Sequence, residues 1–189
     1  MKTASRFGSV LLAACPLLFS GATPSRQADK SAPTPSPRGF RQADVKSRDA
    51  IVAALYDSIS GPAGERDWER FRSLFIPEAQ LIASINNKDR ALTYKSMTVQ
   101  GYIDGAGKYF KEHGFYEREI SRKLESFGSV THIFSTYESR ETADGRPFER
   151  GINSIQLFGD GSRWWIVDVY WTGETPENPI PARYLSKNE

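Results

Sequence analysis

The stretch of greatest chemical interest is Gly151 to Glu174, GINSIQLFGDGSRWWIVDVYWTGE, in which a single acid, Asp168, interrupts an apolar run. Side chains alternate between the two faces of a strand, so Asp168 is expected to share a face with Trp164 and Ile166. Tyr170 follows on the same face. A carboxyl group among aromatic side chains has its pKa raised by desolvation, which suits it to general acid or base catalysis. The alternative is that Asp168 lies in an ion pair at the rim, or that this face points outward.

A histidine could act with this acid. His132 lies in a strand-like run, and imidazole is the side chain suited to proton transfer at neutral pH, whereas His113 ends a predicted helix, where a cation complements the helix dipole. The sequence therefore predicts Asp168, His132 and Tyr170 as the catalytic group. The alternative for His132 is a core histidine bonded to a neighbour. One histidine lacks the cluster that a metal site needs, and no phosphate loop or catalytic triad motif is present, so no metal and no cofactor are expected.

Further side chains are expected to bind a ligand. Tyr137 and Asn153 lie on adjoining predicted strands and offer hydrogen bonds, and Trp164 and Trp68 offer aromatic surface. The charged runs YESRE and ERG are suited equally to cross-strand ion pairs and to an acidic ligand. A ligand pocket is usually apolar with a few convergent polar groups, which this set would supply.

The elements that position these residues follow from hydrophobic spacing. Helical spacing predicts helices over 51–59, over 68–75 before Pro77, and over 99–110. The runs AQLIASI and LTYKSMT around the turn NNKDR predict a hairpin. Four strand-like runs with glycine-containing connections then predict consecutive antiparallel hairpins: 117–127, 130–141, 150–158 and 163–171.

The composition bounds the class of protein. At 189 residues, of which 39% are hydrophobic, the chain has room for one packed domain with extensions. The formal net charge is +2, and the first 22 residues contribute Lys2 and Arg6 with no acid, so the rest of the chain has a net charge of zero. Such a balance does not predict the basic face that a nucleic-acid partner needs.

The N-terminus has the layout of a secretory signal: two early cations, an apolar run and small residues before position 23. This layout predicts an exported protein, periplasmic or secreted. The alternative is a lipoprotein whose membrane anchor is Cys15, the only cysteine. The expected organisation is a signal peptide, a disordered Pro- and Ser-rich tether, a folded domain and a C-terminal tail: 1–22, 23–43, 44–173 and 174–189.

The order helix, helix, hairpin, helix and four strands is an α+β pattern. With the stretches DWERFRSLFIPEAQLI, GFYEREISRKLESFGSVTHIFSTYESR and RGINSIQLFGDGSRWWIVDVYW, it resembles the nuclear transport factor 2-like, or SnoaL-like, superfamily over about residues 45–172. The resemblance implies a cystatin-like cone, in which a strongly bent antiparallel sheet packs on three N-terminal helices and encloses a pocket. Isomerase members carry an aspartate base where this chain has Ala79 to Ala83, without an acid. Dehydratase members pair histidines with an aspartate and tyrosines. This chain has only the histidines His113 and His132, so the resemblance implies at most part of that set.

The expected function is binding of a small, largely apolar organic molecule, with acid–base chemistry of lyase, isomerase or hydrolase type as its reaction class. The alternative is a non-catalytic binding module or a dimeric assembly module. The last strand is apolar on both faces, and Trp165 and Trp171 are expected on the outer one, which predicts a homodimer through the sheet. The alternative cover for that face is the C-terminal tail, through its apolar residues Ile180, Tyr184 and Leu185.

Overall fold

A computed structural model describes residues 39–86 and 92–186, all of which belong to one compact unit. The predicted signal peptide with Cys15, residues 23–38 of the predicted tether and most of the turn NNKDR lie outside the described residues. Within the described part of the chain, no helix is both long and apolar enough to cross a membrane.

The helices lie where hydrophobic spacing predicts them, with a short one added before them. They are α1 (Gln42–Val45), α2 (Arg48–Ile59), α3 (Trp68–Arg72) and α4 (Val99–Glu112). Each of the last three begins at a side chain that accepts a hydrogen bond from a backbone N–H of the first turn: Ser47, Asp67 and Thr98. Helix α3 is shorter than predicted, because the chain turns into a strand at Phe75, before Pro77.

Six strands form one sheet in the order β2-β1-β6-β5-β4-β3. The strands are β1 (Phe75–Asn86), β2 (Leu92–Thr98), β3 (Tyr116–Phe127), β4 (Val130–Arg140), β5 (Glu149–Gly159) and β6 (Trp164–Gly173). The predicted hairpins are confirmed: β1 pairs with β2, and β3 to β6 pair in sequence, all antiparallel. The predicted all-antiparallel sheet is corrected at one place, where β1 and β6 pair in parallel.

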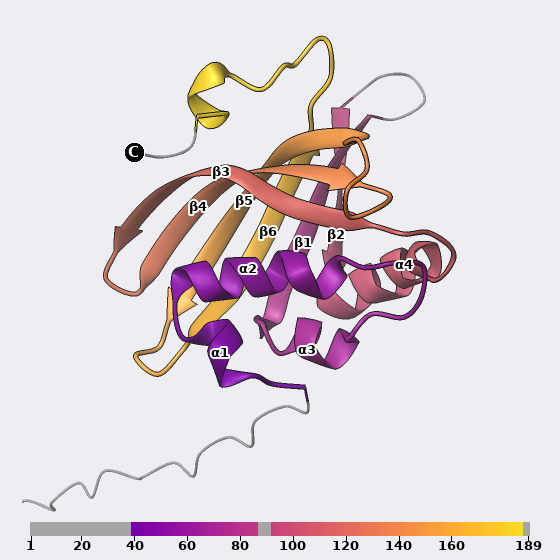
Figure 1. Cartoon of the computed structure of the whole chain (residues 1–189). Coiled ribbons are helices and arrows are strands. Elements are labelled where there is room, and N and C mark those ends of the chain that lie inside the picture. Colours follow the sequence, from indigo (N-terminus) through magenta and orange to yellow (C-terminus); the bar gives the residue numbers. More distant parts are fainter. Residues whose placement is uncertain (1–38, 87–91, 187–189) are drawn as a thin grey trace, which may run out of the picture. The chain divides into compact units, whose positions relative to one another are not determined.

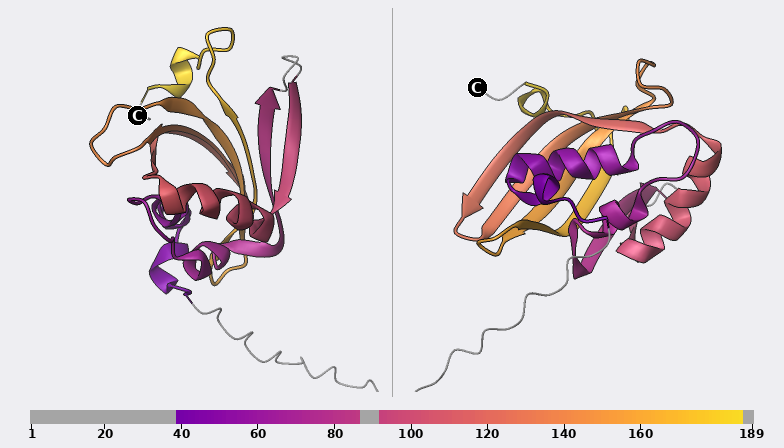
Figure 2. Two further views of the ribbon diagram at one scale, coloured as in Figure 1. Left: turned by 90° about the vertical axis from the view of Figure 1, so that its right-hand side faces the viewer. Right: turned by 60° about the horizontal axis from the view of Figure 1, so that its bottom comes forward.

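The sheet curves towards helix α2, which crosses its inner face (Figures 1 and 2). The inner face carries the hydrophobic core, in which Ile133, Ile155 and Ile166 on β4, β5 and β6 have no exposed surface. Helix α2 packs against these strands with Ile51, Val52 and Leu55, all buried. Burial of each such side chain stabilises the fold by roughly 1.5 to 3 kcal/mol, so this layer fixes the strand faces.

The C-terminal tail lies over part of the outer face. Its last turn is η1 (Ala182–Tyr184), whose Tyr184 ring packs 4.9 Å from that of Phe134 on β4. The Thr136 hydroxyl donates to the Tyr184 carbonyl at 2.6 Å, and the Ser121 hydroxyl donates to the Ser186 carbonyl at 2.6 Å. These contacts place the tail over β3 and β4, whereas the alternative to dimerisation expects it over the outer face of the last strand.

Candidate functional site

The expected orientation of Asp168 is wrong, because strand β6 contains a bulge. Ile166 lies opposite Leu157 of β5, but Asp168 lies opposite Gln156, so Val167 is an extra residue that has no partner in the register. A bulge reverses the alternation of faces beyond it. Ile166 therefore points inward with no exposed surface, whereas Asp168 points to the outer face.

The three predicted catalytic residues lie together on that outer face, away from the core. His132 and Asp168 both lie opposite Gln156, which separates them. His132 shares a hydrogen bond of 3.0 Å between its Nε2 and Ser154 Oγ, so it is bonded to a neighbour as the alternative expects, but on the outer face and not in the core. Tyr170 is 46% exposed. Burial raises the pKa of Asp168, and the nearby His132 opposes this. Any chemistry of this trio stays a prediction, and it would take place outside the inner cavity.

The tryptophans are divided between the two faces. The Trp164 ring packs at the core edge under the Arg48 guanidinium, 5.7 Å from its centroid, and Trp68 packs on Phe110 beside α4. Trp171 lies past the bulge and so faces inward, where it meets Tyr102 edge to face. Its expected place on an outer dimer surface is therefore wrong, and only Trp165 lies there.

An inner cavity of about 160 Å³ lies between the sheet and helices α2, α3 and α4. Two predicted ligand-binding residues, Tyr137 and Asn153, line it, and Trp164 and Trp68 do not. Its lining consists of aromatic and aliphatic side chains and of a polar group: Leu55, Ile59, Phe71, Leu81, Tyr102, Phe115, Val169 and Trp171, and then Glu117, Tyr137, Ser139, Glu149 and Asn153. An apolar cavity of similar size can hold one benzene ring.

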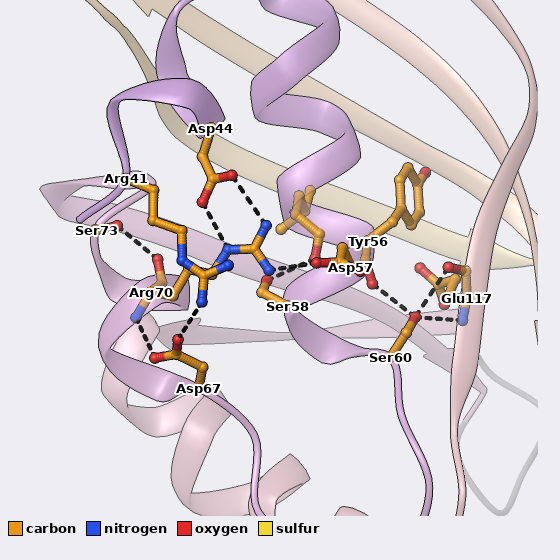
Figure 3. Close-up of polar contacts among 11 residues, drawn as sticks. Arg41, Asp44, Tyr56, Asp57, Ser58, Ser60, Asp67, Arg70, Ser73 and Glu117 are labelled. Carbon is orange, nitrogen blue, oxygen red and sulfur yellow. Dashed lines mark hydrogen bonds and ion pairs between the residues drawn. The ribbon is translucent and has the colours of Figure 1, made fainter. Parts of the chain in front are cut away.

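Glu117 of β3 is the principal titratable group of the cavity. Its backbone N–H donates to Ser60 Oγ at 2.9 Å, which ties the strand to the end of helix α2 (Figure 3). Its carboxylate accepts from Ser139 Oγ at 2.9 Å and from Asn153 Nδ2 at 3.5 Å. Burial raises the pKa of Glu117 to about 7, against the effect of these two hydrogen bonds, and Glu149 raises it further by repulsion between like charges.

A second acid stands at the mouth of the cavity. The Tyr137 hydroxyl donates to Glu149 Oε1 at 2.9 Å. Glu149 and Trp171 line both the inner cavity and a larger hollow on the surface, so they mark the junction between the two. Tyr137 reaches Glu149 because Gly151 lies opposite it, and a Cβ there would stand 2.5 Å from the tyrosine oxygen.

A chain of hydrogen bonds leads from Asn153 in the cavity to Glu119. Asn153 Nδ2 donates to the Tyr56 hydroxyl at 3.1 Å, which bonds Ser135 at 2.7 Å. Ser135 Oγ then donates to Glu119 at 2.5 Å, and Glu119 is in an ion pair with Arg122. Burial raises the pKa of Tyr56, with Glu117 as the next cause, so this hydroxyl stays protonated. The network holds Asn153 against the Glu117 carboxylate.

Sequence reasoning missed Glu117, Glu149 and Tyr102. The available signal was the alternation in EREIS at 117–121, which puts Glu117 and Glu119 on one face of a predicted strand. Within residues 39–86 and 92–186, no group of three His, Cys, Asp or Glu side chains could hold a metal ion. The cavity therefore offers an aromatic box, two carboxylates and fixed hydrogen bonds, which suit proton transfer to a small organic molecule.

Comparisons with known proteins support the fold. No family model matches the sequence, and no curated protein matches it. A Nostoc punctiforme protein of unknown function with a cystatin-like fold matches with a TM-score of 0.51 and 10% identity, over 69% of this chain and 90% of that one. A Mycobacterium tuberculosis protein of unknown function matches with a TM-score of 0.52 and 15% identity, over 69% of this chain and 72% of that one.

A third solved structure comes from Novosphingobium aromaticivorans and is described as the beta subunit of an aromatic-ring-hydroxylating dioxygenase. It matches with a TM-score of 0.50 and 17% identity, over 70% of this chain and 94% of that one. At such identities the likeness concerns the fold alone. The predicted α+β cone, cystatin-like and nuclear transport factor 2-like, is confirmed.

Proposed function

We propose that the chain binds a small, largely apolar organic molecule in the inner cavity and that Glu117 transfers a proton to or from it. The observation that carries this proposal is the Glu117 carboxyl, whose pKa burial raises to about 7. At neutral pH such a group is close to half protonated, which is the best condition for a general acid or base. Ser139 and Asn153 hold the carboxylate in one orientation, so it meets a ligand without rearranging.

The aromatic side chains supply the binding surface. Tyr102, Phe115 and Trp171 line the cavity, and a ring of benzene size can lie against them. A hydrogen on carbon or oxygen of the ligand would pass to Glu117 as a proton, and the electron pair of the broken bond would remain on the ligand. Return of that proton to another atom of the ligand would complete an isomerisation, and loss of a leaving group would complete an elimination.

Proton transfer can be measured before the substrate is identified. We expect the protein to accelerate exchange of the α-protons of small cyclic ketones in D2O, followed by NMR, and Glu117→Gln to lower this acceleration by roughly 100- to 10,000-fold. Glu125→Gln is the matched control, because Glu125 lies on the same strand opposite His132, on the outer face. Equal exchange by the wild type and Glu117→Gln would refute the role of Glu117.

The second candidate function is a dimeric assembly module. It is favoured by a row of apolar side chains across four adjacent strands of the outer face: Phe127, Val130, Phe158 and Trp165. Phe127 is 90% exposed and Val130 is 59% exposed, so this row lies beyond the cover that the tail provides. Sedimentation should show a dimer that Phe158→Glu dissociates, and a monomeric wild type would exclude this function.

The N-terminal residues carry a further proposal, which is export from the cytoplasm. It rests on the signal layout of residues 1–22 and on the tether composition that follows. The intact mass of protein recovered from the cell envelope decides its form. A start at Thr23 is expected for soluble release, and a lipid adduct on Cys15 for an anchored protein. An uncleaved cytosolic product would refute both.

A further inference from the structure

Among the polar side chains that line the inner cavity, most donors are already bonded whereas several acceptor oxygens are free, and this restricts the ligand. Three of the cavity's donor groups are already used: Ser139 Oγ donates to Glu117, Tyr137 donates to Glu149, and Asn153 Nδ2 donates to Tyr56 and Glu117. The Tyr102 hydroxyl and the Trp171 indole N–H, which also line the cavity, have no hydrogen-bond partner among the described residues and remain donors. The other atoms free to bond a ligand there are oxygens with lone pairs.

Asn153 shows this imbalance most clearly. Its side chain is 5% exposed and lines the cavity, and its amide nitrogen is held by Tyr56. None of the described residues donates a hydrogen bond to its Oδ1, which therefore lacks a partner but keeps some accessible surface that a ligand can reach. A ligand that donates hydrogen bonds would supply that partner.

The charges in the cavity have the same bias. Glu117 and Glu149 both line it, and neither forms an ion pair with any of the described residues. A groove between α2 and β3 is lined by Glu117 together with three arginines, and these are paired with other carboxylates. Arg118 and Arg140 pair with Glu138, and Arg122 pairs with Glu119. Glu149 is exposed, but the Glu117 carboxyl is desolvated, and a desolvated carboxylate without a cation is costly. A cationic ligand would remove that cost.

The apolar walls suit the same ligand. Tyr102, Phe115 and Trp171 line the cavity, and aromatic faces attract organic cations through the negative charge on the ring face. From these observations we infer that the ligand is a small aromatic or cyclic amine, bound as its ammonium ion between Glu117, Glu149 and Asn153 Oδ1. An ammonium has three donors and no acceptor, which matches the free oxygens. This inference rests on the proposed function and names its substrate class.

Isothermal titration calorimetry with three probes of one size tests this inference. The probes are benzylamine, which is a cation at neutral pH, benzyl alcohol, which is neutral, and benzoate, which is an anion. We expect benzylamine to bind about tenfold or more tightly than benzyl alcohol, since charge-assisted hydrogen bonds are about twice as strong as neutral ones, and benzoate not to bind. Glu117→Gln should reduce this preference to about threefold or less, and Glu125→Gln should leave it unchanged.

Proton release gives a second readout. A cation beside Glu117 favours its ionised form, so benzylamine binding at pH 6 should release up to one proton, measured in two buffers of different ionisation enthalpy. Glu117→Gln should abolish the release. The other titratable groups that face Glu117 are Glu149, Glu119, Tyr137, Tyr56 and Tyr102, and the tyrosine pKa values are all raised, so these hydroxyls stay protonated.

The outcomes separate this inference from the proposed function. If benzyl alcohol binds as tightly as benzylamine, the amine inference is wrong and the apolar cavity keeps its proposed role. If none of the three probes binds, the proposed function fails and this inference fails with it. If benzylamine binds with the same affinity and proton release to Glu117→Gln, it binds elsewhere, and the inference is again refuted.

Discussion

Acidic side chains lie on two sides of helix α2, and they differ in their hydrogen-bond and ion-pair partners (Figure 3). On one side, Arg70 of α3 donates to both carboxylate oxygens of Asp44, at 2.7 and 3.0 Å, and also pairs with Asp57. Beyond the other side, Glu117 has only the uncharged donors Ser139 and Asn153. The difference teaches that a paired acid joins elements of the fold, whereas an acid without a cation is left able to exchange a proton.

The largest effect is expected where the paired side of this comparison is broken. The Arg70 and Asp44 side chains are only 11% and 13% exposed. Arg70→Met leaves the Asp44 charge buried without a partner, which should lower the free energy of unfolding by about 3 to 5 kcal/mol. Urea denaturation followed by circular dichroism measures this. Arg72→Met is the control, because Arg72 is 40% exposed and should cost under about 1 kcal/mol. Equal losses would mean that the Asp44 pair does not hold α1.

The unpaired side predicts a dependence of stability on pH. The pKa of Glu117 rises from its ordinary 4.5 in the unfolded chain to about 7 in the fold. The folded state therefore holds more protons between these values, and stability falls as pH rises from about 4.5 to 7. The loss is on the order of 3 kcal/mol. Glu117→Gln should remove this slope and exceed the wild type in stability at pH 8, measured by urea titrations from pH 4 to 8. Parallel curves for the two proteins would contradict the assignment.

The packing that directs Tyr137 towards Glu149 predicts a somewhat smaller effect. A Cβ at Gly151 would stand 2.4 Å from the Thr172 carbonyl oxygen and 2.5 Å from Tyr137 Oη. Gly151→Ala should cost about 1 to 3 kcal/mol by overpacking and weaken benzylamine binding. Gly105→Ala is its counterpart, because a Cβ there meets nothing within 4 Å and an alanine in helix α4 should stabilise by up to about 1 kcal/mol. Thermal unfolding separates the two. A Gly151→Ala protein as stable as the wild type would contradict this placement.

The smallest effect is expected for Asp168, which is an acid of a third kind, outside the cavity. Asp168→Asn should leave binding to the inner cavity unchanged. It should alter the free energy of unfolding by only a few tenths of a kcal/mol, in the stabilising direction, since burial raises the pKa of this carboxyl. Titration calorimetry with benzylamine checks the first expectation. If Asp168→Asn abolished benzylamine binding, Asp168 would belong to the binding site and this prediction would be wrong.

The sequence predicts the elements well, because periodicity reports local structure directly. The four runs after residue 116 become β3 to β6, and the helix faces carry the expected core. It fails at β6 because a bulge is not visible in alternation: Val167 is one more apolar residue in an apolar run. The same shift puts Trp171 inside. The inward orientation of Tyr137 on β4 and Asn153 on β5 is predicted correctly, because these two strands pair without such a shift.

Glu117 could not be singled out for a related reason. Its chemistry comes from partners on other strands and on α2, among them Ser139 and Asn153, whose register was unknown. From sequence, Glu117 is one of several acids in a charged strand. The raised pKa belongs to the assembled cavity and to no single segment. Local patterns therefore predict which face a strand buries, and tertiary pairing decides which buried carboxyl is left without a cation.

The parallel pairing of β1 with β6 also affects the order in which the protein can fold. It joins Leu74, whose carbonyl accepts from the Ile166 N–H at 2.9 Å, to the last strand of the chain. The chain between Leu74 and Ile166 must close into a loop before these contacts can stabilise the fold, and closing so long a loop slows folding. Strand β1 therefore has only β2 as a partner until β6 has been synthesised. Until then the inner cavity lacks the side that β6 supplies through Val169 and Trp171.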